Sequence, residues 1–232
     1  MRTHTALVVS HRLNNCTRML GVAALVLMLF VAVFATSSHA LSGKPKTPAD
    51  APAAAAGVPE RVLGKANAPV TLEEFASLTC SHCADFYTHT LPELEKRYVD
   101  TGKVKIIFRD FPLDGTGLKA AAIARCMPAE QYYPFIATLY KNLMAWSMSP
   151  NPEEVLAQYA KLGGLSADKA KSCLSDNAMF DAIIAVRNKA TEAYGIEATP
   201  VFILNGGVEK IQGAKSLDEF VAAIERVSAA KK

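Results

Sequence analysis

Two cysteines three residues apart stand where a predicted strand meets a predicted helix. Residues 69–76 form a short apolar stretch with β-branched character, and the segment after the cysteines places apolar residues at helical spacing. Gly102 ends this helix, and residues 104–108 are the next strand candidate. A strand–helix–strand unit normally has parallel strands and a right-handed crossover. Cys80 and Cys83 are therefore predicted at the carboxyl end of a strand, where a helix begins.

The next eighty residues have helical patterns. Helices are expected over 118–127, 131–146, 152–162, 166–174 and 179–194. Ser166 is a candidate N-cap, and Gly195 is expected to end the last of these helices.

Strand patterns then return. Residues 201–204 and 208–211 flank Asn205-Gly206-Gly207, which is typical of a hairpin turn, and an amphipathic helix is predicted over 216–227. The outer segments together predict a small sheet with helices on its faces. The expected architecture is thus one α/β domain over 58–229 that contains a helical insertion, 113–190.

The first forty residues have the pattern of a secretory signal peptide. Three arginines precede an uninterrupted apolar run, 19–35, and Ser38 and Ala40 supply the small residues of a cleavage site. We expect cleavage after Ala40. The alternative is an uncleaved anchor in the inner membrane, because the run is at the short limit for crossing a hydrocarbon core of about 30 Å. In either case the rest of the chain is exported, which in a bacterium means the periplasm.

Residues 41–57 are rich in Pro and Ala and have no apolar periodicity, which predicts a flexible linker. A disordered terminus without a spacer role is an equal alternative. The whole chain has 25 basic and 22 acidic residues, and the first forty residues contain three of the basic ones and no acid. The exported part is therefore neutral and has no basic stripe, so we expect no nucleic-acid binding.

The spacing of the cysteine pair suits disulfide exchange. On the first turn of a helix, two such sulfurs can close a small-ring disulfide. The first of them lies where unpaired backbone N–H groups and the helix dipole favour a thiolate, which is the nucleophile in exchange. Each unit by which its pKa falls favours the reduced pair by about 1.4 kcal/mol. His82, between the cysteines, can add a hydrogen bond or a charge to the sulfur of Cys80.

Two other readings of the pair remain open at this point. It could be half of a zinc site, but Cys126 and Cys173 form no second pair of this spacing, and His89 is the only other histidine after residue 40. It could also be a purely structural bridge, for which a strand-to-helix corner is poorly suited. We expect neither a metal nor a cofactor.

Residues 74–83, Glu-Phe-Ala-Ser-Leu-Thr-Cys-Ser-His-Cys, resemble the DsbA-like family of exported thiol:disulfide oxidoreductases in the thioredoxin superfamily. Thr199-Pro200, directly before a predicted strand, and the helical insertion match this family as well. The resemblance covers residues 58–229 and implies a thioredoxin fold with an inserted helical domain. The family usually has proline where this chain has Ser81, which leaves the redox potential open. Thr199 is shared with isomerase and reductase relatives, so the direction of exchange is also open.

The resemblance implies a role for each matching residue. Cys80 would form the mixed disulfide with a substrate, Cys83 would be the buried resolving thiol, and His82 would stabilise the Cys80 thiolate. Pro200, in a cis peptide, would end its strand short of the site, while Thr199 would offer backbone groups to an extended substrate. A trans Thr199–Pro200 bond is the alternative, since most bonds before proline are trans.

Glu74 matches a buried acid that relays protons to the resolving cysteine. A buried carboxyl would have a raised pKa, which suits that task. The alternative is an ordinary exposed strand residue beside Glu73.

Cys126 and Cys173 lie in predicted helices of the insertion, and export permits a disulfide between them. Some bacterial relatives have a second, non-catalytic bridge in this domain, so the resemblance favours a structural Cys126–Cys173 disulfide. Two separate buried thiols are the alternative. Cys16 lies in the signal segment and is expected to have no structural role.

The expected function is the introduction of disulfides into secreted or periplasmic proteins. Unfolded or newly exported polypeptides would be the substrates, and a membrane redox partner would re-oxidise the dithiol. We expect a monomer. An isomerase or reductase of the same fold is the main alternative, although isomerases generally need a dimer and no dimerisation domain is evident. A metal-binding protein without enzymatic activity is the third reading.

Overall fold

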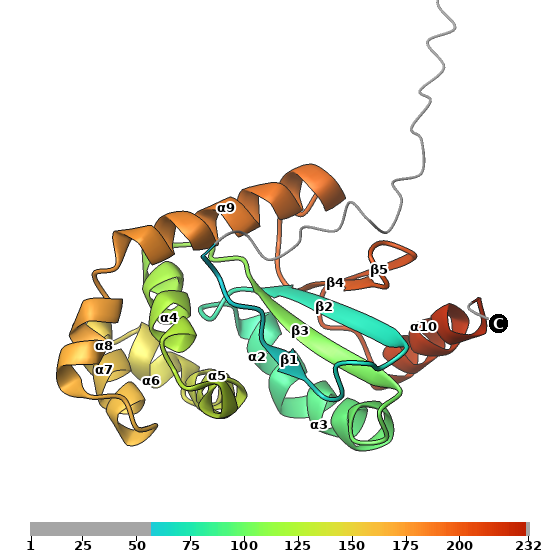
Figure 1. Ribbon diagram of the computed structural model, residues 1–232, viewed down its shortest axis with the longest axis horizontal. Helices are drawn as coiled ribbons and strands as arrows, with labels where there is room; N and C mark the ends of the chain where they lie inside the picture. Colours follow the sequence, from blue (N-terminus) through green and yellow to red (C-terminus); the bar gives the residue numbers. More distant parts are fainter. Residues whose placement is uncertain (1–56, 231–232) are drawn as a thin grey trace, which may run out of the picture. The chain divides into compact units, whose positions relative to one another are not determined.

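The computed structural model describes residues 57–230 (Figure 1). The predicted signal segment, 1–40, lies outside these residues, and so does the predicted linker, 41–57, except for Gly57. No helix among the described residues is long and apolar enough to span a membrane.

A five-stranded mixed sheet forms the centre of the described domain. Its strands are ordered β1-β3-β2-β4-β5. They comprise β1 (Val62–Leu63), β2 (Val70–Ala76), β3 (Val104–Asp110), β4 (Val201–Leu204) and β5 (Glu209–Gln212). β2 and β3 run parallel and every other pair is antiparallel, which confirms the predicted strand–helix–strand unit. Sequence patterns missed β1, because two residues are too few to show alternation.

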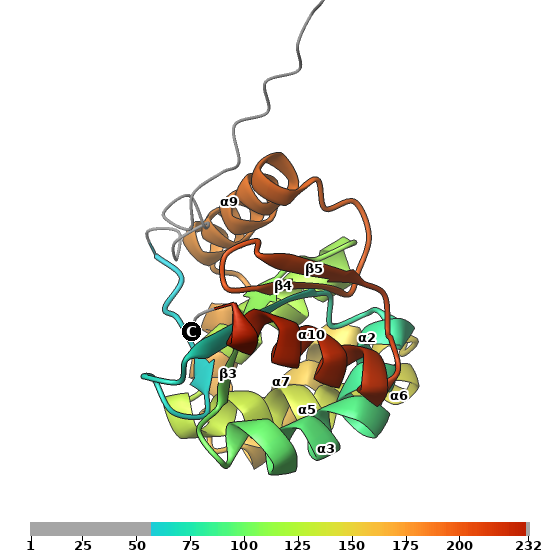
Figure 2. The same ribbon diagram turned by 90° about the vertical axis from the view of Figure 1, so that its right-hand side faces the viewer.

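Helices cover both faces of the sheet (Figures 1 and 2). On one face lies α9 (Asn177–Tyr194), where Ala190 packs in a cluster with Phe75 and Ile203. On the other face lie α10 (Leu217–Ala229) and the helical segment that follows β2. The ring of Phe86 in that segment lies 5.2 Å, centroid to centroid, from Phe220 of α10. Both faces of β2 are therefore buried, and the two acidic residues of the strand, Glu73 and Glu74, are buried with its apolar residues.

The helical segment after β2 changes its hydrogen-bond pattern along its length. It consists of α2 (Ser81–Asp85), the π-helical turn η2 (Phe86–Thr90), α3 (Leu91–Leu94) and a second π turn, η3 (Glu95–Val99). The sequence predicts a kink or a restart at Pro92. Pro92 does lie in the first turn of α3, where its missing N–H is tolerated, and the π turn before it accommodates the change of register.

The insertion is helical, as predicted, but several of its helices begin and end at other residues than expected. It contains α4 (Gly115–Arg125), the 3₁₀ turn η4 (Ala129–Gln131), α5 (Tyr132–Lys141), α6 (Leu143–Ser147), α7 (Pro152–Leu162) and α8 (Ala167–Cys173). The single helix predicted over 131–146 is wrong. The helix breaks at Asn142, whose backbone leaves the helical region and whose side chain donates to the carbonyl of Thr138, a local bond that competes with helix continuation.

Helix ends agree with the expected capping residues at several places. The Ser166 hydroxyl accepts from the N–H of Lys169, and Gly195 ends α9 in the left-handed conformation. α4 begins three residues earlier than predicted, because the Asp114 carboxylate accepts a hydrogen bond from the N–H of Gly117 and so caps the helix. Such an aspartate is a recognisable N-cap, although two glycines in the first turn weaken the helical pattern.

Candidate active site

Cys80 is the N-cap residue of α2, four residues beyond the end of β2. Its backbone is extended (φ −88°, ψ 121°), and its N–H donates to the carbonyl of Ser77 at 3.1 Å. Its own carbonyl accepts from the N–H of Ala84. This turn places the Cys80 side chain at the start of the helix, where N–H groups lack intrahelical partners.

The surroundings of Cys80 favour its anion. They lower the pKa of Cys80 from the ordinary value of 9.0 to about 5. The largest cause is a hydrogen bond with the thiol of Cys83, and burial opposes it. Hydrogen bonds with Thr199 and with the backbone N–H groups of Cys83 and His82 lower the pKa further. Cys80 is therefore a thiolate at neutral pH, which is the reactive form in disulfide exchange.

Cys83 has the opposite character. Its side chain is fully buried, and burial, the hydrogen bond to Cys80 and the nearby Glu74 together raise the pKa of the Cys83 thiol. Both cysteines are unbridged in this structure. The pair thus joins one stable thiolate to one thiol that retains its proton, so Cys80 has the more reactive sulfur of the two.

Glu74 lies beneath the cysteines on β2, between Phe108 of β3 and Phe202 of β4 in the strand register. It is fully buried, so the reading of Glu74 as an exposed strand residue is wrong. Among the described residues neither of its carboxylate oxygens has a hydrogen-bond partner. Burial, and then the charge of Cys80, raise the pKa of Glu74 well above 4.5. Its neighbour Glu73 is also buried, but it pairs with the guanidinium of Arg109 at 2.7 Å.

The Thr199–Pro200 peptide is cis and lies directly before β4. β4 pairs with β2, and this pairing brings Thr199 to Cys80 although 119 residues separate them in the chain. The sulfur of Cys80 lies 3.5 Å from the backbone oxygen of Thr199. An extended chain that reaches Cys80 therefore passes beside the backbone of this loop.

Ser81 and His82, between the cysteines, are both exposed. The Nδ1 atom of His82 lies 3.8 Å from a carboxylate oxygen of Asp85, one turn farther along α2. Among the described residues, no hydrogen bond joins the His82 imidazole to the sulfur of Cys80; His82 contributes through its backbone N–H instead.

Sequence reasoning missed the roles of Thr79, Asp114 and Tyr140, which support the segment before Cys80. The hydroxyl of Thr79 donates to the Asp114 carboxylate at 2.8 Å, and the hydroxyl of Tyr140 donates to the carbonyl of Ser77 at 3.1 Å. These bonds join the insertion to the active-site turn. Asp114 was recognisable as a cap, but no sequence signal links Tyr140 to a turn 63 residues earlier.

Gly117 marks the closest approach of α4 to this turn. A Cβ atom at Gly117 would lie 3.0 Å from the hydroxyl oxygens of both Ser77 and Thr79. A side chain at this position would therefore displace α4 or the turn.

Cys126 and Cys173 are joined by a disulfide that links the end of α4 to α8, with their Cα atoms 6.4 Å apart. Within residues 57–230 no group of three or more His, Cys, Asp or Glu side chains is arranged to bind a metal ion. The cysteine pair therefore belongs to no such metal-binding group among these residues.

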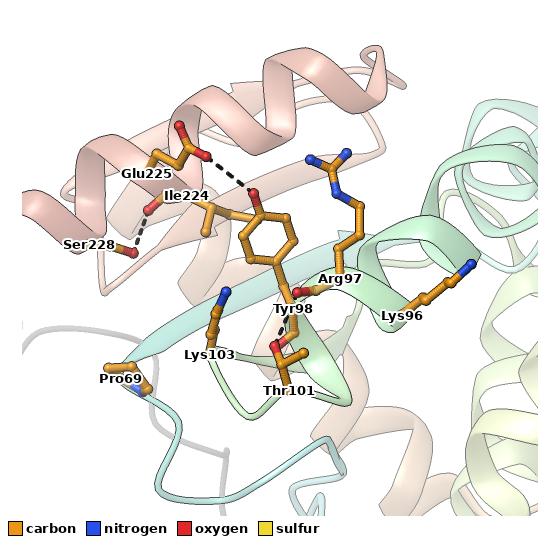
Figure 3. Close-up of a pocket in the computed structure, with 9 residues that line it drawn as sticks. All are labelled: Pro69, Lys96, Arg97, Tyr98, Thr101, Lys103, Ile224, Glu225 and Ser228. Atoms are coloured by element: carbon orange, nitrogen blue, oxygen red, sulfur yellow. Dashed lines mark hydrogen bonds between the residues drawn. The ribbon is translucent and has the colours of Figure 1, made fainter.

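A separate pocket of about 700 Å³ lies at the other end of the sheet (Figure 3). Pro69 and Lys103, which line it, precede β2 and β3, whereas Cys80 follows the opposite end of β2. The hydroxyl of Tyr98 points across this pocket to Glu225 of α10. The pocket is therefore remote from the cysteine pair and takes no part in its chemistry.

Comparison with known proteins identifies relatives of this fold and site. Residues 57–226 match the family model described as thioredoxin. The crystal structure of Wolbachia pipientis alpha-DsbA1 superimposes with a TM-score of 0.68, at 32% identity, over 74% of this chain and 92% of that one. Disulfide bond formation protein D of Bacillus subtilis is 27% identical over 71% of this chain and 75% of its own length.

A protein of Rickettsia bellii described as a protein-disulfide oxidoreductase is 33% identical over 148 residues, or 63% of this chain. The chain covers only 57% of the length of that relative. The residues matched by the family model contain the sheet, the cysteine pair and the helical insertion. The chain has a thioredoxin fold with an inserted helical domain, and it belongs to the DsbA-like family of thiol:disulfide oxidoreductases.

Proposed function

We propose that this protein oxidises pairs of thiols in exported polypeptides by exchange through the Cys80–Cys83 disulfide. The observation that supports this proposal is the contrast between the two sulfurs: the pKa of Cys80 is lowered to about 5, whereas that of Cys83 is raised. A stable Cys80 thiolate lowers the free energy of the reduced pair, which makes the oxidised pair a stronger oxidant. The same contrast favours the oxidase direction over a reductase or isomerase of the same fold.

The first step transfers the disulfide to the client. A client thiolate attacks the sulfur of Cys80, a client–Cys80 disulfide forms, and the Cys80–Cys83 bond breaks. The electron pair passes to the sulfur of Cys83, which takes up a proton because its pKa is raised. Glu74 is the proposed donor, because burial raises its pKa and so favours the protonated carboxyl near Cys83.

The second step releases the product. Another client thiolate attacks the client sulfur of the mixed disulfide, and Cys80 leaves as its stable thiolate. The client has then lost two electrons, and the pair has gained them as one thiolate and one thiol. A new cycle requires an oxidant, for which we infer a redox partner in the membrane. The predicted signal peptide supports the periplasm as the compartment, and we propose that the protein acts there as a monomer.

Client chains are proposed to contact apolar side chains beside the cysteine pair. Leu113 is 47% exposed, and its N–H donates to the hydroxyl of Ser77 in the active-site turn. Met144 and Met148, about 70% exposed, lie one helical turn apart at α6, which directly follows the α5 helix that contacts this turn through Tyr140. We propose that these three exposed side chains form an apolar client-binding surface on the insertion, because such a surface suits unfolded segments.

Turnover of a reduced, unfolded protein tests the proposed function. The oxidised protein should form disulfides in this client, with glutathione disulfide as the terminal oxidant. Cys80→Ser should abolish exchange, because the attacked sulfur is absent. Cys83→Ala should accumulate client–Cys80 mixed disulfides, detected on non-reducing gels. Full turnover by Cys80→Ser, or no oxidation by the wild-type protein, would reject the assignment.

A further inference from the structure

Asp85 is an acidic residue one helical turn beyond His82, and the matching family motif gives it no role. Its carboxylate lies 3.8 Å from Nδ1 of His82, and both side chains are largely exposed, at 61% and 72%. Asp85 is farther from the start of α2 than His82, whereas Cys80 lies before that start. An imidazole directed toward Asp85 is therefore directed away from the sulfur of Cys80.

Acidic side chains lie near the first turn of α2. Asp114 accepts the hydroxyl of Thr79, the residue before Cys80, and Asp85 lies on α2 itself. A carboxylate near Cys80 disfavours its thiolate. The groups that lower the pKa of Cys80 include Cys83, Thr199 and the backbone N–H groups of Cys83 and His82. The His82 imidazole lies beside Asp85 instead.

We propose that Asp85 is a positioning residue that keeps the His82 imidazole away from the Cys80 sulfur and so limits the oxidising strength of the Cys80–Cys83 pair. The proposal deepens the function proposed above and rests on exchange through this pair. A protonated imidazole near Cys80 would stabilise the thiolate and favour the reduced pair. Asp85 competes for that imidazole, and its own negative charge acts in the same direction.

The test is the equilibrium of the pair with glutathione in Asp85→Asn. In this reaction two glutathione thiols are oxidised to one disulfide, while the protein disulfide becomes the Cys80 thiolate and the Cys83 thiol with release of one proton. The measurement is made at the same pH and ionic strength for the wild-type protein and the variant. Asp85→Asn should shift the equilibrium toward the reduced protein by about threefold, the range expected for an exposed ionic contact.

The rate of Cys80 alkylation against pH provides a second readout. The midpoint of this profile should move to lower pH in Asp85→Asn, a change that a purely structural role for Asp85 would not produce. Glu93→Gln is the matched control. It removes one exposed negative charge from α3, about 12 Å beyond Asp85 along the same helical segment, and should leave both measurements unchanged.

A double-mutant cycle identifies whether Asp85 acts through His82. In the His82→Ala background, Asp85→Asn should shift the equilibrium with glutathione much less than it does in the wild-type protein. The proposal is overturned if Asp85→Asn leaves the equilibrium unchanged, shifts it toward the oxidised protein, or has its full effect without His82. A wild-type protein that does not exchange with glutathione would instead overturn the proposed function itself.

Discussion

At the scale of single residues, Glu74 is the most unusual group in the domain. A carboxyl with no hydrogen-bond partner in a fully buried position strongly disfavours ionisation, which is why its pKa is raised. In the unfolded chain the same group ionises near 4.5. Rising pH therefore stabilises the unfolded state relative to the folded one, from pH 4.5 up to the folded-state pKa. Glu74 destabilises the fold at neutral pH, which is understandable for the proton donor proposed above.

Glu74→Gln should consequently raise the free energy of unfolding at pH 7.5 and leave it nearly unchanged at pH 4. Each pH unit between 4.5 and the folded-state pKa adds up to about 1.4 kcal/mol to the difference. Urea titrations of the oxidised proteins at the two pH values measure it, because the catalytic cysteines do not titrate in that form. Equal stabilities at pH 7.5 would show that Glu74 ionises normally in the folded protein.

At the scale of elements, α6 presents two methionines to solvent while Trp146 on the same helix is fully buried. Replacing both Met144 and Met148 with Gln should lower kcat/KM for an unfolded client by about tenfold, which corresponds to about 1.4 kcal/mol and to only partial burial of the two side chains against a client. Exchange with glutathione, which offers no unfolded apolar segment to these side chains, should not change.

Leu162→Gln is the control for this pair. Leu162 is 85% exposed at the end of α7, so its replacement removes a comparable apolar surface elsewhere in the insertion. A similar loss of client turnover in Leu162→Gln would show that the effect is not specific to α6. Flexible, polarisable methionines suit clients of many different sequences.

The disulfide joins two further elements, α4 and α8, and closes a loop with a sequence separation of 47 residues. Replacing both Cys126 and Cys173 with Ala should lower the free energy of unfolding by about 4 kcal/mol, according to the chain-entropy relation for a loop of this length. Chemical denaturation of the variant and of the wild-type protein measures the difference. A loss below about 1 kcal/mol would indicate that the insertion is stable without this link.

At the scale of the whole molecule, the sequence was informative where patterns are local. The cysteine spacing, the strand patterns of β2 to β5 and the capping residues Ser166 and Gly195 each depend on neighbours within a few positions, and the structure contains them. The break at Asn142 was missed because apolar periodicity continues across it.

Contacts between distant parts of the chain could not be derived from residue patterns. The placement of Thr199 against Cys80 depends on the pairing of β4 with β2, and only the family resemblance anticipated it. The hydrogen bond from Tyr140 to Ser77 and the contact of Asp114 with Thr79 depend on how the insertion folds back onto the sheet. The orientation of His82 toward Asp85 depends on the side-chain conformations of two exposed residues, and no sequence pattern indicates these conformations.

Because Gly117 has no side chain, the insertion and the active-site turn lie in close contact at this position. The hydroxyl oxygens of Ser77 and Thr79 both lie 3.0 Å from the position that a Cβ atom would take, so alanine there would require these hydroxyls to shift by a few tenths of an ångström. A substitution at Gly117 would therefore act directly on the segment that leads to Cys80.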